Sequence, residues 1–204
     1  MTWRAVTIGE LGKVVTGKTP KSSSPDEFGT DFPFITPSDM LFSVRNINTE
    51  RFLSNKGKEA LSKASLPKKS ICVVCIGATI GKVCLTRTES YSNQQINSII
   101  PNRQKHHPDF IYYLATLLRD TLESFAGGAA TPIVNKSVFS AIKILVPDLQ
   151  TQKKIAAILS AYDDLIENNK RRIALLENMA EEIYREWFVR FRFPNYKNAE
   201  FEKG

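Results

Sequence analysis

The chain has 204 residues, enough for one folded domain with an extension or for two small domains. No apolar run approaches the roughly 18 residues that a membrane-spanning helix needs, so the composition excludes a helical membrane protein. An odd number of cysteines, three, and an amino terminus without the pattern of a secretion signal argue against a disulfide-linked secreted protein. We therefore expect a cytoplasmic protein.

The positive charge is concentrated in the first part of the chain. Residues 1–145 hold 18 Lys and Arg against 11 Asp and Glu, whereas residues 146–204 hold 10 of each kind. A basic domain followed by a neutral segment suggests contact with a polyanion in the first part and with protein in the second. A soluble domain with a scattered positive surface is the alternative.

The first hundred residues alternate between loops and short strands. The Gly-, Pro- and Ser-rich stretch 16–25 predicts a loop, residues 32–36 a strand stopped by proline, and residues 43–69 a polar stretch with one helical turn near Glu59. Residues 71–76 and 82–86 predict a hairpin with the five-residue loop 77–81, and residues 96–100 predict a further strand.

After residue 107 the apolar spacing becomes helical. Residues 108–125 predict a helix that ends before Gly127 and Gly128, and residues 142–146 predict a last strand. Residues 1–147 are thus expected to form one α+β domain with a mainly antiparallel or mixed sheet.

One long helix is the clearest feature of the remaining chain. Residues 151–190 contain no proline or glycine, and their apolar residues recur every three or four positions. Such a helix is about 60 Å long at roughly 1.5 Å per residue, too long to bury its apolar stripe on the preceding domain. We assign residues 148–192 to a spacer helix that needs a partner, and residues 193–204 to a tail.

The heptad pattern of this helix suits self-pairing. Its candidate contact residues comprise five heptad a positions and Ile158, namely Ile155, Ile158, Tyr162, Asn169, Leu176 and Ile183. The a positions are symmetric about Asn169, which predicts an antiparallel coiled coil crossing there, with the polar Asn setting the register. The crossing would also bring Glu167 near Arg171 of the partner, although these two residues are equally an (i, i+4) pair within one helix.

Catalytic and metal-binding motifs are missing from the sequence. Cys72 and Cys75 form a lone CxxC inside a predicted strand, where positions three apart point to opposite faces. The pair His106-His107 is expected to be a solvated turn before a helix. The stretch 77–82 lacks the spacing of a phosphate loop and leads into a strand. We therefore expect no catalytic residue, no metal site and no cofactor in this chain.

Several stretches of the chain follow one another in a specific order and spacing. They are Ile8-Gly9-Glu10-Leu11-Gly12, Gly17-Lys18-Thr19-Pro20, Phe34-Ile35-Thr36-Pro37-Ser38-Asp39-Met40, Gly77-Ala78-Thr79-Ile80-Gly81-Lys82, Ser92-Asn93-Gln94-Gln95-Ile96-Asn97, residues 146–155, and Trp187-Phe188-Val189-Arg190-Phe191-Arg192-Phe193-Pro194. Together they resemble the specificity subunit of type I restriction–modification enzymes, and the similarity covers nearly the whole chain.

The resemblance implies a non-catalytic DNA-recognition subunit. Members of that family usually hold two target-recognition domains, each followed by a long helix, and the paired helices space two DNA half-sites. They dock methyltransferase subunits, which use S-adenosylmethionine, and a translocating nuclease subunit for restriction. This chain has one domain and one helix, so the resemblance implies either a half-length subunit acting as a homodimer or a fragment.

Loop residues are the best candidates for contact with double-stranded DNA, because strand and helix residues are committed to packing. Lys and Arg would bind phosphates, and polar side chains would read base edges. The candidates are Lys18, Thr19, Lys21, Ser38, Asp39, Arg45, Asn46, Thr79, Lys82, Asn135 and Lys136. Gln94 and Gln95 fit a structural hydrogen-bonding role as well as base contact.

Two other functions stay open from the residues alone. One is a DNA- or RNA-binding regulator that dimerises through its helix, although no helix-turn-helix, RRM or zinc pattern occurs. The other is a nuclease with an unrecognised site, for which Asp39 and Asp148 are the carboxylates to test.

Overall fold

The computed structural model describes residues 2–42, 44–125 and 133–200. It divides into two compact units, Met1–Ile158 and Leu159–Gly204. The first unit holds every strand that the structure describes together with the shorter helices, and the second holds most of the long helix and the short helical turns near the carboxyl terminus.

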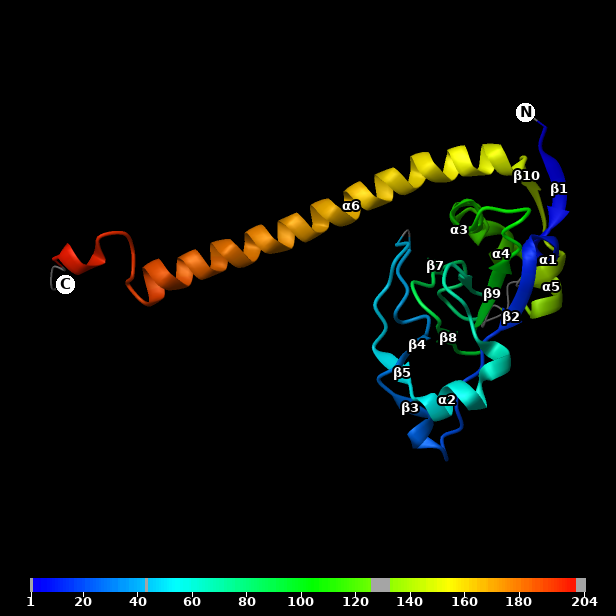
Figure 1. The fold of residues 1–204 in the computed structure, drawn as a ribbon, viewed down its shortest axis with the longest axis horizontal. Coiled ribbons are helices and arrows are strands. Elements are labelled where there is room, and N and C mark those ends of the chain that lie inside the picture. Colours follow the sequence, from blue (N-terminus) through cyan, green and yellow to red (C-terminus); the bar gives the residue numbers. More distant parts are fainter. Residues whose placement is uncertain (1, 43, 126–132, 201–204) are drawn as a thin grey trace. The chain divides into compact units, whose positions relative to one another are not determined.

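Three sheets build the first unit (Figure 1). The smallest pairs β1 (Arg4–Thr7) with β10 (Lys143–Val146) in antiparallel orientation. The central sheet is antiparallel, and its strand order is β2 (Gly12–Thr16), β9 (Ile96–Pro101), β6 (Ile71–Val74), β7 (Val83–Leu85).

The third sheet is mixed. Its strand order is β3 (Phe28–Gly29), β5 (Arg51–Leu53), β4 (Phe32–Ile35), β8 (Tyr91–Ser92). Strands β4 and β8 run parallel and the other pairs are antiparallel. The prediction of a mainly antiparallel or mixed α+β domain followed by one long helix is therefore confirmed.

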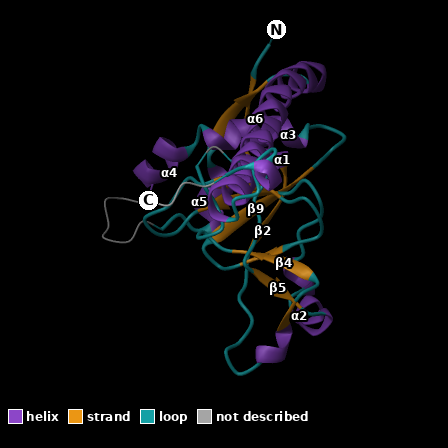
Figure 2. Cartoon of the chain, turned by 90° about the vertical axis from the view of Figure 1, so that its left-hand side faces the viewer, coloured by secondary structure: helices purple, strands orange, loops and turns teal. Residues whose placement is uncertain are grey.

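The helices of the first unit are short. They are α1 (Ile8–Leu11), α2 (Asn55–Ala60), α3 (Pro108–Thr116), α4 (Arg119–Phe125) and α5 (Lys136–Ala141), with 3-10 turns at Pro25–Glu27 and Ser62–Ala64. Figure 2 shows α2 beside β4 and β5, at the end of the unit away from β1. Among the short helices of the first unit, the sequence predicted only a turn near Glu59, where α2 lies, and one helix over 108–125, where α3 and α4 lie.

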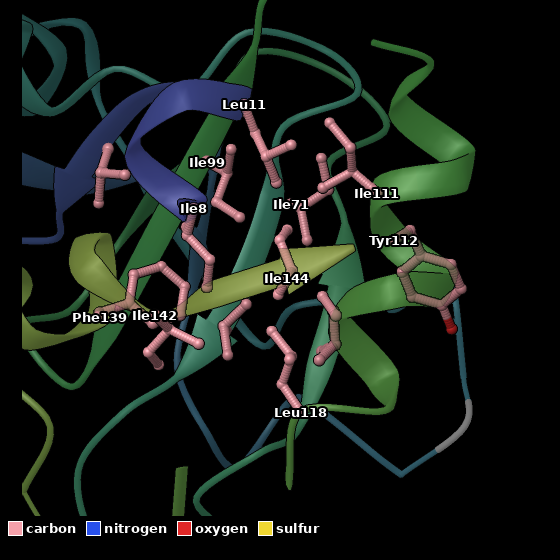
Figure 3. Packing of buried hydrophobic residues seen from close by; sticks show 14 of the residues in the cluster. Ile8, Leu11, Ile71, Ile99, Ile111, Tyr112, Leu118, Phe139, Ile142 and Ile144 are labelled. Atoms are coloured by element: carbon pink, nitrogen blue, oxygen red, sulfur yellow. The ribbon is translucent and has the colours of Figure 1, made fainter. Parts of the chain in front are cut away.

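The core occupies both faces of the central sheet. Side chains alternate along a strand, so Ile71 and Val73 of β6 enter the cluster beneath α1, α3 and α5, whereas Cys72 and Val74 enter a second cluster on the other face. Figure 3 shows the first cluster, with Phe139 of α5 among the labelled residues. Burial on both faces explains why β6 reads as a continuous apolar run rather than an alternating one.

The predicted helix over 108–125 is wrong as a single element, since α3 ends at Thr116 and α4 starts at Arg119. A continued helix would bond the Leu117 N–H to the Tyr113 carbonyl. The Thr116 hydroxyl donates to that carbonyl at 2.7 Å, and the Leu117 N–H goes to the Leu114 carbonyl at 3.2 Å. This side-chain competition and the tighter turn end the helix.

The long helix α6 spans Leu149–Tyr184 and continues as a π-helical turn, Arg185–Val189, before a 3-10 turn at Tyr196–Asn198. Asp148 caps its start: Oδ1 accepts from the Thr151 N–H at 3.0 Å and Oδ2 from the Thr151 hydroxyl at 2.8 Å. These contacts give Asp148 a structural role as a helix cap. The nuclease alternative is therefore not required to explain this carboxylate.

Buried polar groups fix the first turns of α6 within the first unit. Gln152 is fully buried, its Nε2 donates to the Pro147 carbonyl at 2.9 Å, and its Oε1 accepts from the His107 N–H at 3.0 Å. The His106 ring lies 3.4 Å from Gln152 Nε2 and is 2% exposed. The expectation of a solvated turn at His106-His107 is wrong, because this turn packs against Gln152 in the first turns of α6.

None of the helices that the structure describes is long and apolar enough to cross a membrane.

Candidate nucleic-acid interface

The first predicted loop folds onto the turn between β8 and β9. The Lys18 N–H donates to the Ser92 carbonyl at 2.8 Å, and the Thr19 hydroxyl donates to Gln94 Oε1 at 2.6 Å. The Asn93 N–H bonds to the Ile35 carbonyl at 3.1 Å, which joins this turn to the end of β4. Residues 17–19 and 93–95 are therefore held beside the start of the loop that follows β4 with Thr36 and Pro37, which we call the Thr-Pro loop.

The hairpin loop between β6 and β7 completes this arrangement. Gly77 and Gly81 have φ values of 94° and 85°, which glycine adopts readily and side-chain-bearing residues rarely do. The Cys75 N–H donates to the Gln95 carbonyl at 2.8 Å, and Lys82 Nζ donates to the Pro37 carbonyl at 3.1 Å. We call residues 17–19, 36–39, 77–82 and 93–95 the loop cluster.

The structure thus brings together six of the eleven candidates for DNA contact in the loop cluster, namely Lys18, Thr19, Ser38, Asp39, Thr79 and Lys82. Five of them carry an amine or a hydroxyl group. Of these five, Lys18 and Ser38 are exposed, and the other three are half-buried. Their amine and hydroxyl groups suit phosphates and base edges respectively.

Asp39 lies in the loop cluster but its carboxylate is committed to the backbone. Oδ2 accepts from both the N–H and the hydroxyl of Thr36 at 2.7 Å, and Oδ1 accepts from the Glu50 N–H at 3.0 Å. The side chain shapes the Thr-Pro turn and ties it to residue 50. These bonds favour a structural role over the base contact that the sequence suggested.

Asn135 and Lys136 lie next to the hairpin loop, because the Val134 N–H bonds to the Cys75 carbonyl at 2.8 Å. Asn135 is the N-cap of α5, and its Oδ1 accepts from the Val138 N–H at 3.0 Å. Lys136 is exposed. Of these two candidates, Lys136 is better placed to meet DNA.

The other three candidates lie outside the loop cluster. The side chain of Arg45 is 11% exposed and lies 3.7 Å from Asp109, so it serves the packing of the loop against α3. Asn46 lines a hollow beside β7. Lys21 is exposed in the turn that follows residue 20.

Sequence reasoning missed an apolar tip on the Thr-Pro loop. Leu41 and Phe42 are 59% and 44% exposed. The guanidinium of Arg119 lies 4.5 Å from the centre of the Phe42 ring, and Lys82 Nζ lies 5.7 Å from it. An exposed aromatic ring between two cations can contact a base or a thymine methyl while the cations face phosphates. Two adjacent apolar residues in a polar loop were the available signal.

The three cysteines are buried free thiols. Cys72 and Cys84 belong to the second core cluster and Cys75 to the first, so Cys72 and Cys75 lie on opposite faces of the central sheet, as the strand pattern predicted. Burial raises the pKa of the Cys75 thiol to about 11, which keeps it protonated and unreactive at neutral pH. Among the described residues no three His, Cys, Asp or Glu side chains are grouped to hold a metal ion.

Burial also lowers the pKa values of His106 and His107 below the usual histidine value. For His106 the nearby Arg4 charge acts in the same direction, and for His107 the Asp109 carboxylate opposes the effect of burial. Burial thus favours the neutral form of both rings at the junction with α6.

The apolar stripe of the long helix is exposed. Ile158, Tyr162, Leu176 and Ile183 are 61%, 63%, 62% and 48% exposed, and Asn169 is exposed as well. Ile155 differs, because it is half-buried against the core of the first unit. Arg171 lies 3.6 Å from Glu167 of the same helix, so the (i, i+4) pair exists without any partner.

Comparison with known proteins places this fold in a family. Residues 1–178 match the family described as "Type I restriction modification DNA specificity domain". The chain is 33% identical over 204 residues to the MjaIX specificity subunit of Methanocaldococcus jannaschii, covering 98% of this chain and 46% of the relative. It is 37% identical over 179 residues to the HindI specificity subunit of Haemophilus influenzae, covering 82% and 38%.

Solved structures agree on the fold. The S subunit of a type I restriction–modification system from M. genitalium superposes with a TM-score of 0.66 at 17% identity, over 95% of this chain and 46% of that one. The HsdS subunit from Thermoanaerobacter tengcongensis gives 0.60 at 18%, over 91% and 44%. The chain spans about half the length, or less, of these relatives. It belongs to the family of type I restriction–modification DNA specificity domains.

Proposed function

We propose that this chain is a sequence-specific DNA-binding specificity subunit that reads one half of an interrupted target. Residues 1–147 form the recognition domain, residues 148–192 the spacer helix and residues 193–204 the tail. The chain itself performs no catalysis. The S-adenosylmethionine needed for methylation binds to a separate methyltransferase subunit.

The convergence of four chain segments in the loop cluster carries the proposal for DNA recognition. It contains the amine groups of Lys18 and Lys82 and the hydroxyl groups of Ser38 and Thr79, on a domain whose sequence has a clear excess of positive charge. The cations supply affinity for phosphates, which depends on salt, and the hydroxyl groups supply contacts to base edges. A single domain of this size reads only about one half-site.

The exposed stripe of α6 supports pairing with a second long helix. A helix with apolar side chains left in water along most of its length gains stability by packing against another. We assign that partner to a second copy of the chain in antiparallel orientation, crossing at Asn169. A symmetric dimer predicts a palindromic interrupted target, because each copy meets the same half-site.

The relatives are named as specificity subunits of type I restriction enzymes, which supports a place in a multi-subunit enzyme. We propose that methyltransferase subunits and a restriction subunit dock on the chain.

Co-expression with the cognate methyltransferase subunit, followed by sequencing that detects methylated adenine, tests the function. We expect methylated adenines in a two-part palindromic motif that is absent when either protein is omitted. An asymmetric two-part motif would show a different second half and contradict the homodimer. Stable complex formation without new methylation, or regulation of transcription in its place, would contradict the function itself.

A matched pair of variants tests the loop cluster within the same assay. Ser38→Ala with Thr79→Ala removes two hydroxyl groups from the cluster, and Ser62→Ala with Ser124→Ala removes two from other segments. The first pair should lower methylation at the motif or relax one motif position, and the second should leave the motif unchanged. Equal behaviour of the two pairs would place recognition elsewhere on the domain.

A further inference from the structure

Two adjoining hollows lie along β7, and no residue of the loop cluster lines them. The larger has a volume of about 400 Å³ and the smaller about 160 Å³. Leu85, Thr86 and Arg87 line both hollows, so the two adjoin at these residues. We call the two hollows together the β7 cleft.

The two ends of the β7 cleft differ in chemistry. The larger hollow has an apolar floor that includes Ile35, Ile47 and Phe52, with hydroxyl and amide groups among its lining. The smaller is lined by Lys68, Lys69 and Asn46 besides the shared residues. Within the described part of the chain, no carboxylate lines either hollow.

The surroundings leave the smaller hollow with excess positive charge. Asp109 is the carboxylate behind it, and it already meets Lys69 at 2.6 Å and Arg45 at 3.7 Å. Lys68 and Arg87 are exposed and form no ion pair with any described carboxylate. Among the described residues, the charges of Lys68 and Arg87 at the smaller hollow are thus not balanced by a paired carboxylate, which favours an anionic ligand.

The backbone holds these cations in place. Lys69 has a φ of 69°, a left-handed conformation that is uncommon for a residue with a side chain. Its N–H donates to the Thr86 carbonyl at 2.9 Å, and the Arg103 guanidinium donates to the Lys68 carbonyl. The turn that carries Lys68 and Lys69 is thus fixed against β7, next to Arg87.

We propose that the β7 cleft binds the phosphodiester backbone of the DNA whose half-site is read by the loop cluster. Lys68 and Arg87 contact neighbouring phosphates, and the apolar floor takes the face of the intervening deoxyribose. This contact is independent of sequence, because phosphates and sugars are the same at every step. The inference rests on the proposed DNA-binding function and adds a second surface that supplies affinity rather than specificity.

The experiment compares two doubly substituted versions of the 204-residue chain, which have equal net charge. Lys68→Ala with Arg87→Ala removes the two unpaired cations of the cleft. Lys13→Ala with Lys143→Ala removes two exposed lysines from β2 and β10. Binding to a fluorescein-labelled 30-base-pair duplex of random sequence is measured by anisotropy over a series of salt concentrations. The same series is measured with a duplex that contains the motif identified in the methylation assay.

Each phosphate contact contributes about −0.9 to the slope of log affinity against log salt concentration. The cleft variant should therefore lose roughly 1.8 from the slope, weaken by a similar factor on both duplexes, and keep its preference for the motif. The control should keep the wild-type slope.

Equal slopes for the cleft variant and its control would overturn the cleft proposal while leaving the proposed function intact. Loss of motif preference in the cleft variant would also overturn it, since the contact would then read sequence. Failure of the wild-type chain to bind either duplex would instead contradict the proposed function. Identical unfolding temperatures of the three proteins exclude a folding defect as the cause.

Discussion

The first unit, which we call the recognition unit from here on, buries its apolar residues, whereas the long helix exposes them. In the first unit, Ile71 and Cys72 are successive residues of one strand, and both are fully buried because the central sheet is covered on its two faces. In the second unit, Leu165 and Leu176 are 54% and 62% exposed. The first unit buries these hydrophobic residues in its own core, whereas the helix leaves residues of the same kind exposed and able to pack against another chain segment.

This difference separates two kinds of stability. The fold of the recognition unit should depend on its own core, so core substitutions should act at any protein concentration. Pairing of the helix is an association between chains, so substitutions in its apolar stripe should change the protein concentration at which the chains associate. Substitutions that affect one property alone test this separation.

Truncating the core should have the largest effect. Phe139 of α5 is completely buried, and Phe139→Ala should lower the free energy of unfolding of the recognition unit by about 3–5 kcal/mol, from lost burial and the cavity left behind. Urea unfolding followed by fluorescence measures it. Leu176→Ala serves as the matched control and should leave this transition unchanged. A large loss in the control would show that the two units unfold together.

A charge in the helix stripe should break association without unfolding the recognition unit. Leu176→Asp places a carboxylate against the partner's Tyr162 in the proposed antiparallel pair. It should raise the dimer dissociation constant roughly a hundredfold, the result of about 2.7 kcal/mol at 1.4 kcal/mol per tenfold change. Analytical ultracentrifugation measures it, with Glu177→Asp as control. An unchanged constant would remove Leu176 from the interface.

Removing the apolar tip should weaken DNA binding. Phe42→Ala deletes the ring that lies between Arg119 and Lys82, and affinity for the motif duplex should fall about tenfold, as expected for the loss of about 1.4 kcal/mol. Phe125→Ala removes a comparably exposed ring, 54% exposed, from α4 and should have little effect. Equal losses for both would mean that the tip makes no special contact.

The central Asn should affect geometry more than affinity. Asn169→Leu replaces the proposed register-setting residue, so the helices should still associate but in more than one register or orientation. Cross-linking from single positions along the helix should change from one set of partners to several. Retention of one unchanged antiparallel pattern would show that Asn169 does not set the register.

The cap of α6 predicts a small dependence on pH. The backbone N–H of Thr151, with its hydroxyl, holds the pKa of Asp148 below the ordinary value of 3.8. A lowered pKa stabilises the fold fully above pH 3.8, and the contribution disappears as the pH falls through the folded value. Asp148→Ala should lower the unfolding temperature slightly at pH 7, and the difference should shrink below pH 3.8.

Asp31→Ala, at an exposed residue of a turn, is the control for this comparison and should show no such difference. A gap between Asp148→Ala and the wild type that stays constant down to the most acidic conditions would contradict the role of the charged cap.

Elements defined by local pattern were predictable from the sequence. The hairpin with Gly77 and Gly81 and the long helix follow from glycine placement and apolar period, and both are confirmed, although the helix begins at Leu149 and its last turn is π-helical. The short strand β1 was missed because its pairing partner, β10, lies far along the chain.

The site was predictable as a set of loops but not as a set of roles. Asp39, Asn135 and Arg45 looked like DNA contacts because they are polar or charged and lie in loops. The structure commits their side chains to a turn, a helix cap and an ion pair, and those partners are set by tertiary proximity. Phe42 was missed for the converse reason, since an apolar residue is expected in a core.

Distances between spin labels in the associated protein test the central claim most directly. Labels at Lys170→Cys and Glu182→Cys lie one and thirteen residues from the proposed crossing point at Asn169. At about 1.5 Å per residue, an antiparallel pair offsets the two copies of a label along the helix axis by about 3 Å at position 170 and about 39 Å at position 182. The account predicts a short distance for the first label and a long one for the second. Short distances at both positions, or no defined distance at either, would contradict it.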